Sequence, residues 1–230
     1  MALCGAKGGV GTTALALALA VVSGATLVDL ADGRSDLSDL LGRRPEGTIA
    51  GLAQLGLDLD GALDSITGTH PSGLQVLAGG GHDQLDLLPQ GLSASIVRAL
   101  RHGRPLTLVD TGRGLAPAAR EAVAAADATL LVTTPDAQAA AAARAQLLAL
   151  GRVGVDQTTV AVVVNRWSRR AELSVRSLER ACGAHVAAVV PESADRMAEF
   201  ANARLALDRW PGRRLREPLA ALVRTPPVAA

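Results

Sequence analysis

The chain has 230 residues and a mass of 23.4 kDa, with 49% hydrophobic residues and a net charge of +1 at pH 7. A chain of this length can bury about 70% of its unfolded surface in a single domain, so a second domain is not expected. The small net charge excludes a global basic field, and a nucleic-acid partner would require a local basic patch.

Neither the cysteines nor the apolar runs indicate an extracellular or membrane-spanning protein. Cys4 and Cys182 lack metal-ligand spacing and are predicted to be core thiols in a reducing compartment. The longest apolar run, 14–22, is about half of what a spanning helix requires. We therefore expect a cytoplasmic protein without a membrane span of its own.

Apolar runs and helical patterns alternate along the chain in an order typical of α/β proteins. Residues 14–22 alternate Ala and Leu, but their alanine-rich composition and their position favour a helix. Strands are predicted at 2–4, 25–30, 74–77, 106–110, 128–132, 159–164 and 186–190. Helices are predicted at 14–22, 36–41, 48–55, 93–101, 116–124, in an alanine-rich segment ending at 150, at 172–182, and twice more before the end.

This alternation predicts one α/β domain over residues 1–224, with a mostly parallel sheet of about seven strands and helices on both faces. The glycine-rich loop described next makes this domain a predicted P-loop fold. Residues 225–230, with two prolines and small side chains, are predicted to be a disordered tail.

A glycine-rich loop, Gly5-Ala6-Lys7-Gly8-Gly9-Val10-Gly11-Thr12-Thr13, joins the first strand to the first helix. Glycines let successive backbone N–H groups close around an anion, and the following helix directs its positive dipole end at that anion. Most P-loops end in Gly-Lys-Ser/Thr, where the lysine contacts the outer phosphates and the hydroxyl ligates Mg²⁺. Here Thr12 and Thr13 follow Gly11, so the hydroxyl is present and the lysine is absent.

Lys7 is the one lysine among 23 basic residues, since all the others are arginine. A lysine that survives in such an arginine-biased chain indicates a site where a compact ammonium works and a planar guanidinium does not. Chance survival is the alternative interpretation.

The remaining candidate residues follow the ends of predicted strands: Asp29, Asp110, Asn165 and Glu192. The carboxyl ends of parallel strands meet at one edge of a sheet, which is where α/β proteins bind ligands. In P-loop proteins an acid at the end of an apolar strand holds the magnesium shell opposite the Ser/Thr, so Asp110 and Thr13 are predicted to bracket Mg²⁺. Asp29 lies close enough in topology to assist. The alternative is that both acids are N-caps of the next helices.

Taken together, these segments resemble the deviant Walker A ATPases of the ParA/MinD group. The resemblance spans nearly the whole chain and is carried by Lys7-Gly8-Gly9-Val10-Gly11-x-Thr13, Val28-Asp29, Leu108-Val109-Asp110 and Val164-Asn165-Arg166. Within the group the sequence is most similar to the TadZ/CpaE-type proteins that position Flp (Tad) pilus machinery. The loops of those proteins often carry a small residue where Thr12 stands in this chain.

The resemblance implies ATP and Mg²⁺ as cofactors and a homodimer formed through the nucleotide face. Lys7 would be the catalytic signature lysine that reaches the partner's phosphates, with Asp29 as a second catalytic residue. Thr13 and Asp110 would hold the metal. The cofactor-binding residues would be Gly8, Gly9, Val10, Gly11, Thr12, Thr13, Asn165, Arg166 and Pro191. Asn165 and the Pro191 backbone would frame the adenine, although an asparagine after a strand is also a common turn residue.

Two positions depart from the family pattern. Thr12 removes a charge-assisted contact worth about 1.5–3 kcal/mol, which nucleotide binding can survive. The group usually has Asp-x-Asp after the second strand, where the second carboxylate helps to organise the attacking water, but this chain has Asp29-Leu30-Ala31. Hydrolysis is therefore predicted to be slow or absent unless Asp32 or Asp36 substitutes.

We therefore predict an ATP-binding, dimerising protein that positions or recruits a larger assembly, the Flp (Tad) pilus secretion machinery, from the cytoplasm at a cell pole or the inner face of the membrane. One alternative is an active ParA/MinD-type ATPase in DNA segregation or septum-site placement. Another is a pseudo-ATPase scaffold without nucleotide.

Two basic segments suit more than one role. Residues 166–170, with Arg176 and Arg180, would form either a DNA-contacting surface or a solvated helix entry, and the latter is favoured. Residues 213–223 suit a basic amphipathic membrane helix, but Pro218 interrupts the pattern and favours a final packing helix. Any membrane contact is thus expected to be indirect.

Overall fold

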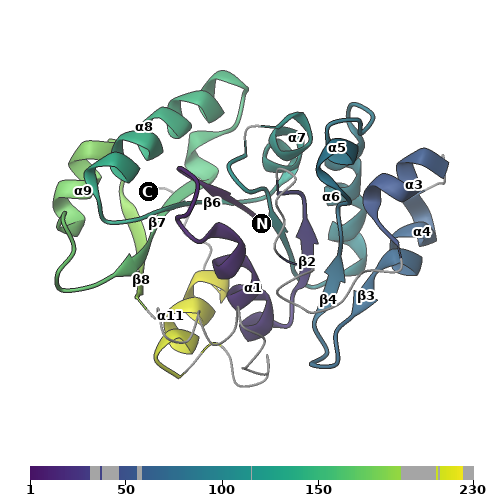
Figure 1. Ribbon diagram of the computed structural model, residues 1–230, viewed down its shortest axis with the longest axis horizontal. Coiled ribbons are helices and arrows are strands. Elements are labelled where there is room, and N and C mark those ends of the chain that lie inside the picture. The colour runs from purple at the N-terminus through teal and green to yellow at the C-terminus, as the bar shows by residue number, and fades with distance from the viewer. Residues whose placement is uncertain are drawn as a thin grey trace.

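The computed structural model describes residues 1–31, 37, 47–55, 59–114, 116–192, 211 and 213–224. Within these residues eight strands form one sheet in the order β3-β4-β2-β5-β1-β6-β7-β8 (Figure 1). Their bounds are β1 Ala2–Gly5, β2 Thr26–Asp29, β3 Gly68–Thr69, β4 Gln75–Leu77, β5 Thr107–Asp110, β6 Thr129–Thr133, β7 Val160–Trp167 and β8 Val186–Pro191. Every neighbouring pair is parallel except β3 and β4, which are antiparallel.

Helices cover both faces of the sheet (Figure 1). The described helices are α1 Thr12–Ser23, α3 Ile49–Leu55, α4 Leu59–Ile66, α5 His82–Leu85, α6 Leu92–Gly103, α7 Pro117–Ala125, α8 Ala137–Arg152, α9 Val175–Cys182 and α11 Arg213–Arg224, with a short 3₁₀ turn at Gln157–Thr159. One face packs against α1 and α11. The opposite face packs against α3 to α9. The predicted mostly parallel α/β sheet is confirmed.

The alternation of side chains along β7 explains why its buried part, residues 160–164, is a continuous apolar run. In β7, Val160, Val162 and Val164 belong to the core shared with α8 and α9. Ala161 and Val163, on the other side of the strand, belong to the core shared with α1 and α11. Because successive side chains point to opposite faces and both faces are covered, no position inside the strand favours a polar residue.

Helix α1 is buried on nearly all sides. Its six central residues, 15–20, are all at most 4% exposed, because α1 packs against the sheet and has α11 beside it on the same face (Figure 1). A helix that is apolar all round must be buried, which explains why its Ala and Leu alternation does not make it a strand. Its expected start at residue 14 moves to Thr12, so Thr12 and Thr13 form its first turn.

Helix α11 corrects a prediction about proline. The helix continues through Pro218 instead of being interrupted there. Leu215, Leu219 and Leu222 are buried in the core beside α1, which confirms a packing helix. Among the described helices, none has the length and apolarity needed to traverse a bilayer.

Other boundaries differ for local reasons. The helix expected at 172–182 begins at Val175, because Ser174 caps it by accepting a hydrogen bond from the Ser177 N–H at 3.1 Å. The sheet has one strand more than expected, β3, and α4 and α5 were not predicted either, because these elements are short and partly exposed. Apart from Leu37, the predicted helix at 36–41 and the tail at 225–230 lie outside the described residues.

Candidate phosphate and metal site

The strand order brings the loop after β1 next to both predicted acids. β5 lies between β1 and β2, and Asp29 at the end of β2 pairs directly with Asp110 at the end of β5. On the other side of β5, Asp110 pairs with Leu3 of β1. Two carboxylates and a glycine-rich loop therefore meet at the carboxyl edge of the sheet, the usual ligand position in parallel α/β folds.

The loop leaves the first turn of α1 without a cap. Gly9 and Gly11 have φ values of 82° and 88°, a left-handed conformation that favours glycine. Gly11 is the N-cap residue of α1, and no side chain of the described residues caps this helix. The first intrahelical bond runs from the Leu15 N–H to the Gly11 carbonyl at 2.9 Å. The N–H groups before Leu15 thus stay available, and together with the helix dipole they form a site for an anion.

Asp110 is a buried carboxylate that is only half satisfied. Its side chain is 1% exposed. Oδ1 accepts a hydrogen bond from the Gly112 N–H at 3.0 Å, whereas Oδ2 is buried without a hydrogen-bond partner. Burial raises the pKa of Asp110 above its ordinary value, and the nearby Thr13 hydroxyl and the Gly112 N–H oppose this only in part. The structure thus brings Thr13 and Asp110 together, as predicted, and leaves one carboxylate oxygen for a cation.

These residues fit Mg²⁺ bound together with a nucleotide. The described residues contain no group of three or more His, Cys, Asp or Glu side chains that would hold a metal by themselves. Mg²⁺ commonly uses one or two protein oxygens and takes its remaining ligands from phosphates and water. Asp110 Oδ2 and the Thr13 hydroxyl beside the phosphate-binding loop match that donor set. The alternative role of Asp110 as an N-cap is wrong, because Ala116 occupies the N-cap of α7.

Asp29 is buried beside Asp110, with 4% of its surface exposed. Its Oδ1 accepts a hydrogen bond from the Ala31 N–H at 3.1 Å. Ala31, at 5% exposure, places a methyl group where the family pattern has a second carboxylate. Asp32 and Asp36, the two residues predicted as possible substitutes, lie outside the described residues.

The side chain of Asn165, on β7, contacts the glycine-rich loop after β1. Its Nδ2 donates to the Val10 carbonyl at 2.8 Å, and it lies 2.6 Å from the point where a Cβ on Gly11 would stand. The expected strand end at residue 164 is wrong, since β7 continues to Trp167 and includes both Asn165 and Arg166. Arg166 has φ 58°, and the pairing of β7 with β8 shifts register there, so the strand bends at this point.

Pro191 ends β8 and pairs with Trp167 of β7. Glu192, which follows it, donates its backbone N–H to the Trp167 carbonyl at 2.8 Å. The Pro191 backbone therefore lies on the strand that neighbours Asn165. The predicted adenine-framing residues share this edge of the sheet, although the role itself stays a prediction.

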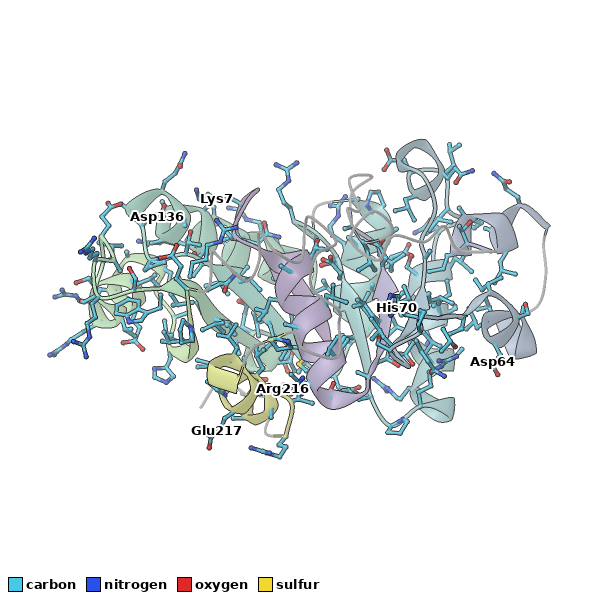
Figure 2. All side chains as sticks on the ribbon, turned by 60° about the horizontal axis from the view of Figure 1, so that its bottom comes forward. Lys7, Asp64, His70, Asp136, Arg216 and Glu217 are labelled. Carbon is cyan, nitrogen blue, oxygen red and sulfur yellow. The ribbon has the colours of Figure 1, made fainter. Side chains whose placement is uncertain are left out.

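Lys7 extends away from its own loop toward the start of α8 (Figure 2). Its Nζ donates to Gln138 Oε1 at 3.4 Å and lies 3.9 Å from Asp136 Oδ1. Asp136 is the N-cap of α8 and accepts from the Ala139 N–H at 2.8 Å. Partial burial acts to raise the pKa of Asp136. Hydrogen bonds from Thr134 and the Ala139 N–H, together with the Lys7 charge, outweigh burial and hold this pKa below the ordinary value.

Sequence reasoning missed Asp136 and Gln138 as neighbours of Lys7. The sequence does indicate that Asp136 caps a helix, because it immediately precedes the alanine-rich segment. Nothing local to residues 136–138 indicates a lysine 131 residues away along the chain from Gln138.

Known proteins resemble this chain in structure more than in sequence. No protein-family profile matches the sequence, and no curated protein is significantly similar to it. The ParA family ATPase from Chlorobium tepidum TLS has a TM-score of 0.82 and 17% identity, over 97% of this chain and 98% of that one. A chain of the MinC:MinD cell division protein complex from Aquifex aeolicus has a TM-score of 0.80 and 21% identity, over 97% of this chain and 94% of that one.

A third structure is the septum site-determining protein MinD from Pyrococcus horikoshii OT3 complexed with Mg-ADP, with a TM-score of 0.79 and 19% identity over 96% of this chain and 94% of that one. At these identities the likeness establishes the fold. The chain thus has the single-domain α/β fold of the ParA and MinD P-loop ATPases.

Proposed function

We propose that the chain belongs to the ParA/MinD family and binds Mg²⁺ and ATP as the link that holds a homodimer together. The observation that carries this proposal is the unpaired, buried Asp110 Oδ2 beside Thr13, at the uncapped start of α1. A buried carboxylate oxygen without a hydrogen-bond partner destabilises the fold, and a bound ligand that contacts this oxygen would remove that cost. A P-loop fold supports a nucleotide as that ligand.

The loop N–H groups and the dipole of α1 would hold the phosphates, and Thr13 and Asp110 would hold Mg²⁺. When bound, the metal neutralises phosphate charge and fixes the orientation of the chain of phosphates. Asn165 keeps its Nδ2 on the Val10 carbonyl, which holds the loop against β7. All of these contributions favour binding, and none of them requires cleavage of the nucleotide.

The site supports retention of ATP better than its hydrolysis. Ala31 has only a methyl group near the end of β2, and one carboxylate oxygen of Asp29 already accepts a hydrogen bond from the Ala31 N–H. A water needs a base or an orienting group within hydrogen-bond reach to attack the phosphate. We therefore propose that ATP serves mainly as a structural ligand in this protein.

Lys7 has the properties of a residue that can change partners. Its side chain is 33% exposed, and its 3.9 Å contact with Asp136 is longer than a strong hydrogen bond. Exposed ion pairs of this kind contribute about 0–1 kcal/mol, so little free energy holds the lysine on α8. In the proposed dimer, Lys7 leaves Asp136 and contacts the phosphates bound by the second copy.

The test is titration with Mg²⁺ and ATP while mass is measured by light scattering, for wild type, Lys7→Ala and the charge-matched Lys7→Arg. We expect wild type to bind ATP and to double its mass, whereas both variants bind ATP and stay monomeric. If wild type binds ATP as a monomer and Lys7→Ala behaves alike, the dimer mechanism is wrong. If wild type shows neither binding nor a thermal shift with ATP, the chain is a scaffold without nucleotide.

Hydrolysis is tested separately by phosphate release. We expect fewer than about one turnover per minute, far below the range of roughly 1–10³ s⁻¹ typical of enzymes. Ala31→Asp, which adds the family carboxylate, is the matched variant and should be faster. Sustained wild-type turnover above this rate would contradict the retention of ATP.

For the cellular role, we propose recruitment of the Flp (Tad) pilus secretion machinery from the cytoplasm, at a cell pole or the inner face of the membrane. The support is the sequence resemblance of the loop, with Thr12 in place of lysine, and the MinC:MinD cell division complex among the similar structures, which includes a protein partner. A fluorescent fusion should form polar foci that recruit the pilus proteins, and wild-type piliation in a deletion strain would count against this role.

An active ATPase of the DNA segregation or septum-placement type is the second candidate. Arg169, Arg170 and Arg176 are exposed, and none of the ion pairs found among the described residues includes them. Such a surface could contact DNA phosphates, and affinity would then fall steeply with added salt. ATP-dependent, salt-sensitive DNA binding that is lost in Arg169→Ala/Arg170→Ala would favour this candidate over the first.

A further inference from the structure

The loop lacks a cation where P-loops usually have one, and Thr12 does not compensate. Thr12 is 7% exposed, and a Cβ on Gly5 would collide with its Oγ1, so the hydroxyl points back toward the end of β1. Lys7, the other basic residue of the loop, has its Nζ on α8. The phosphate-binding N–H groups therefore have no positive side chain contributed by their own loop.

Arg166 comes to the same place from β7. Its Nε and Nη2 both lie 3.8 Å from the point where a Cβ on Gly11 would stand. Gly11 is the residue that starts α1, so the guanidinium lies against the N-terminal end of the helix that forms the anion site. The positive end of the helix dipole repels a guanidinium, so this position is unfavourable unless an anion lies between the two.

The backbone of Arg166 is unusual in a way that produces this position. Arg166 is the only non-glycine residue with a positive φ in the described part of the chain, at 58°. Non-glycine residues adopt this conformation at a cost, so it persists only where surrounding contacts impose it. One such contact is the hydrogen bond from the preceding Asn165 to the Val10 carbonyl, which fixes the end of β7 against the loop.

The guanidinium is also uncommitted. Arg166 is exposed, and no hydrogen bond or ion pair formed within the described residues involves it. By contrast, the Arg104 side chain has four hydrogen bonds, one of which is also its ion pair with Asp64. A guanidinium presents five N–H donors in a planar fork that matches phosphate oxygens.

We propose that Arg166 replaces the missing P-loop lysine: its guanidinium donates to the phosphates of the nucleotide held by the loop. The inference deepens the proposed function and rests on it. Asp110, with its unpaired and buried Oδ2, independently indicates that a ligand completes this edge of the sheet. Asp110 and Arg166 would then contact the same ligand from its metal side and its phosphate side.

The direct test compares Arg166→Asn with wild type, because asparagine tolerates the left-handed backbone. Affinities are measured by calorimetry for Mg²⁺·ATP and for Mg²⁺·tripolyphosphate, which has no base. Loss of charge-assisted phosphate contacts should weaken both ligands about tenfold or more. Arg169→Asn, which removes an exposed arginine three residues away, is the matched control and should weaken them less than twofold. Thermal melting without ligand checks that each variant is folded.

A second arm tests whether the arginine does the work of the lysine. Thr12→Lys should restore the affinity of Arg166→Asn to within about threefold of wild type, and it should improve wild type much less, because coupled residues are not additive. Independent, additive effects would overturn the replacement. A loss confined to ATP, with tripolyphosphate unchanged, would place Arg166 on the base and also overturn it.

The failures of the two proposals are distinguishable. If wild type binds ATP and Arg166→Asn binds it equally well, this inference fails while the proposed function stands. If wild type binds neither ligand, both fail.

Discussion

The most informative prediction concerns Asp110→Asn, which should make the ligand-free protein more stable while weakening its response to Mg²⁺ and ATP. Wild type carries a 1% exposed carboxylate with one unpaired oxygen. Asparagine keeps an acceptor for the Gly112 N–H and removes the buried charge. A buried donor or acceptor left unsatisfied costs about 1–3 kcal/mol, and about 1 kcal/mol shifts the Tm of a domain of this size by 2–4 °C. Asp110→Asn without ligand should thus melt roughly 2–12 °C higher.

Ligand should reverse the order. At a concentration of about 1,000 times Kd, a nucleotide stabilises the folded state by about 4.1 kcal/mol, which exceeds the advantage of about 1–3 kcal/mol expected for Asp110→Asn without ligand. Asp110→Asn loses its metal ligand and should gain much less, so wild type becomes the more stable protein in saturating Mg²⁺ and ATP. Asp86→Asn changes the same charge at an exposed side chain outside this region and should leave both melting temperatures nearly unchanged.

The effect should also depend on pH with a definite sign. Burial raises the pKa of Asp110 in the folded state above that in the unfolded chain, so the folded state binds the proton more tightly. The cost of the carboxylate is absent below about pH 4, the ordinary pKa of Asp, and it grows as pH rises through the raised folded pKa. The advantage of Asp110→Asn should shrink toward pH 4. If the variant is destabilised without ligand at neutral pH, Asp110 is structurally satisfied and our interpretation is refuted.

Three further substitutions test neighbouring contacts. Gly11→Ala should abolish detectable ATP binding in calorimetry, because a Cβ would stand 2.6 Å from Asn165 Nδ2 at a φ of 88°; unchanged affinity would contradict the described loop. Asp136→Asn keeps the N-cap of α8 but releases Lys7, so it should tighten ATP-dependent dimerisation by up to about fivefold in sedimentation, and weaker dimers would show that Asp136 itself contacts the partner. Leu219→Ala, at a fully buried position of α11, should cost about 2–5 kcal/mol in urea unfolding, and a cost near zero would mean that α11 does not pack on α1.

Local physics made much of the fold predictable. The central strands of the sheet are buried on both faces, so each appears as a short, continuous apolar run. Seven of the eight strands were found from apolar runs. The strand that was missed, β3, has two exposed residues and no apolar pattern. The prediction that Pro218 interrupts the last helix was wrong because tertiary packing outweighs a local signal. Burial of Leu215, Leu219 and Leu222 outweighs the loss of one backbone hydrogen bond.

The candidate site was predictable where it lies within one continuous segment. The glycine-rich loop, its missing lysine and Thr13 are properties of nine consecutive residues. Asp29 and Asp110 were predicted as partners because parallel strands end at one edge, and the register pairs them directly. Their environment was not predictable, since the raised pKa of Asp110 comes from burial by elements remote in sequence.

The sequence by itself determined the alternation of strands and helices, the phosphate-binding loop and the departures at Thr12 and Ala31, because each depends on residues next to one another. Tertiary structure alone decided where the cations lie. Lys7 reaches α8 across 131 residues, and Asn165, held to Val10 across 155 residues, brings the guanidinium of Arg166 over Gly11. Such contacts depend on strand order and on one left-handed residue, and no local pattern encodes the distance between groups that meet only when the sheet forms.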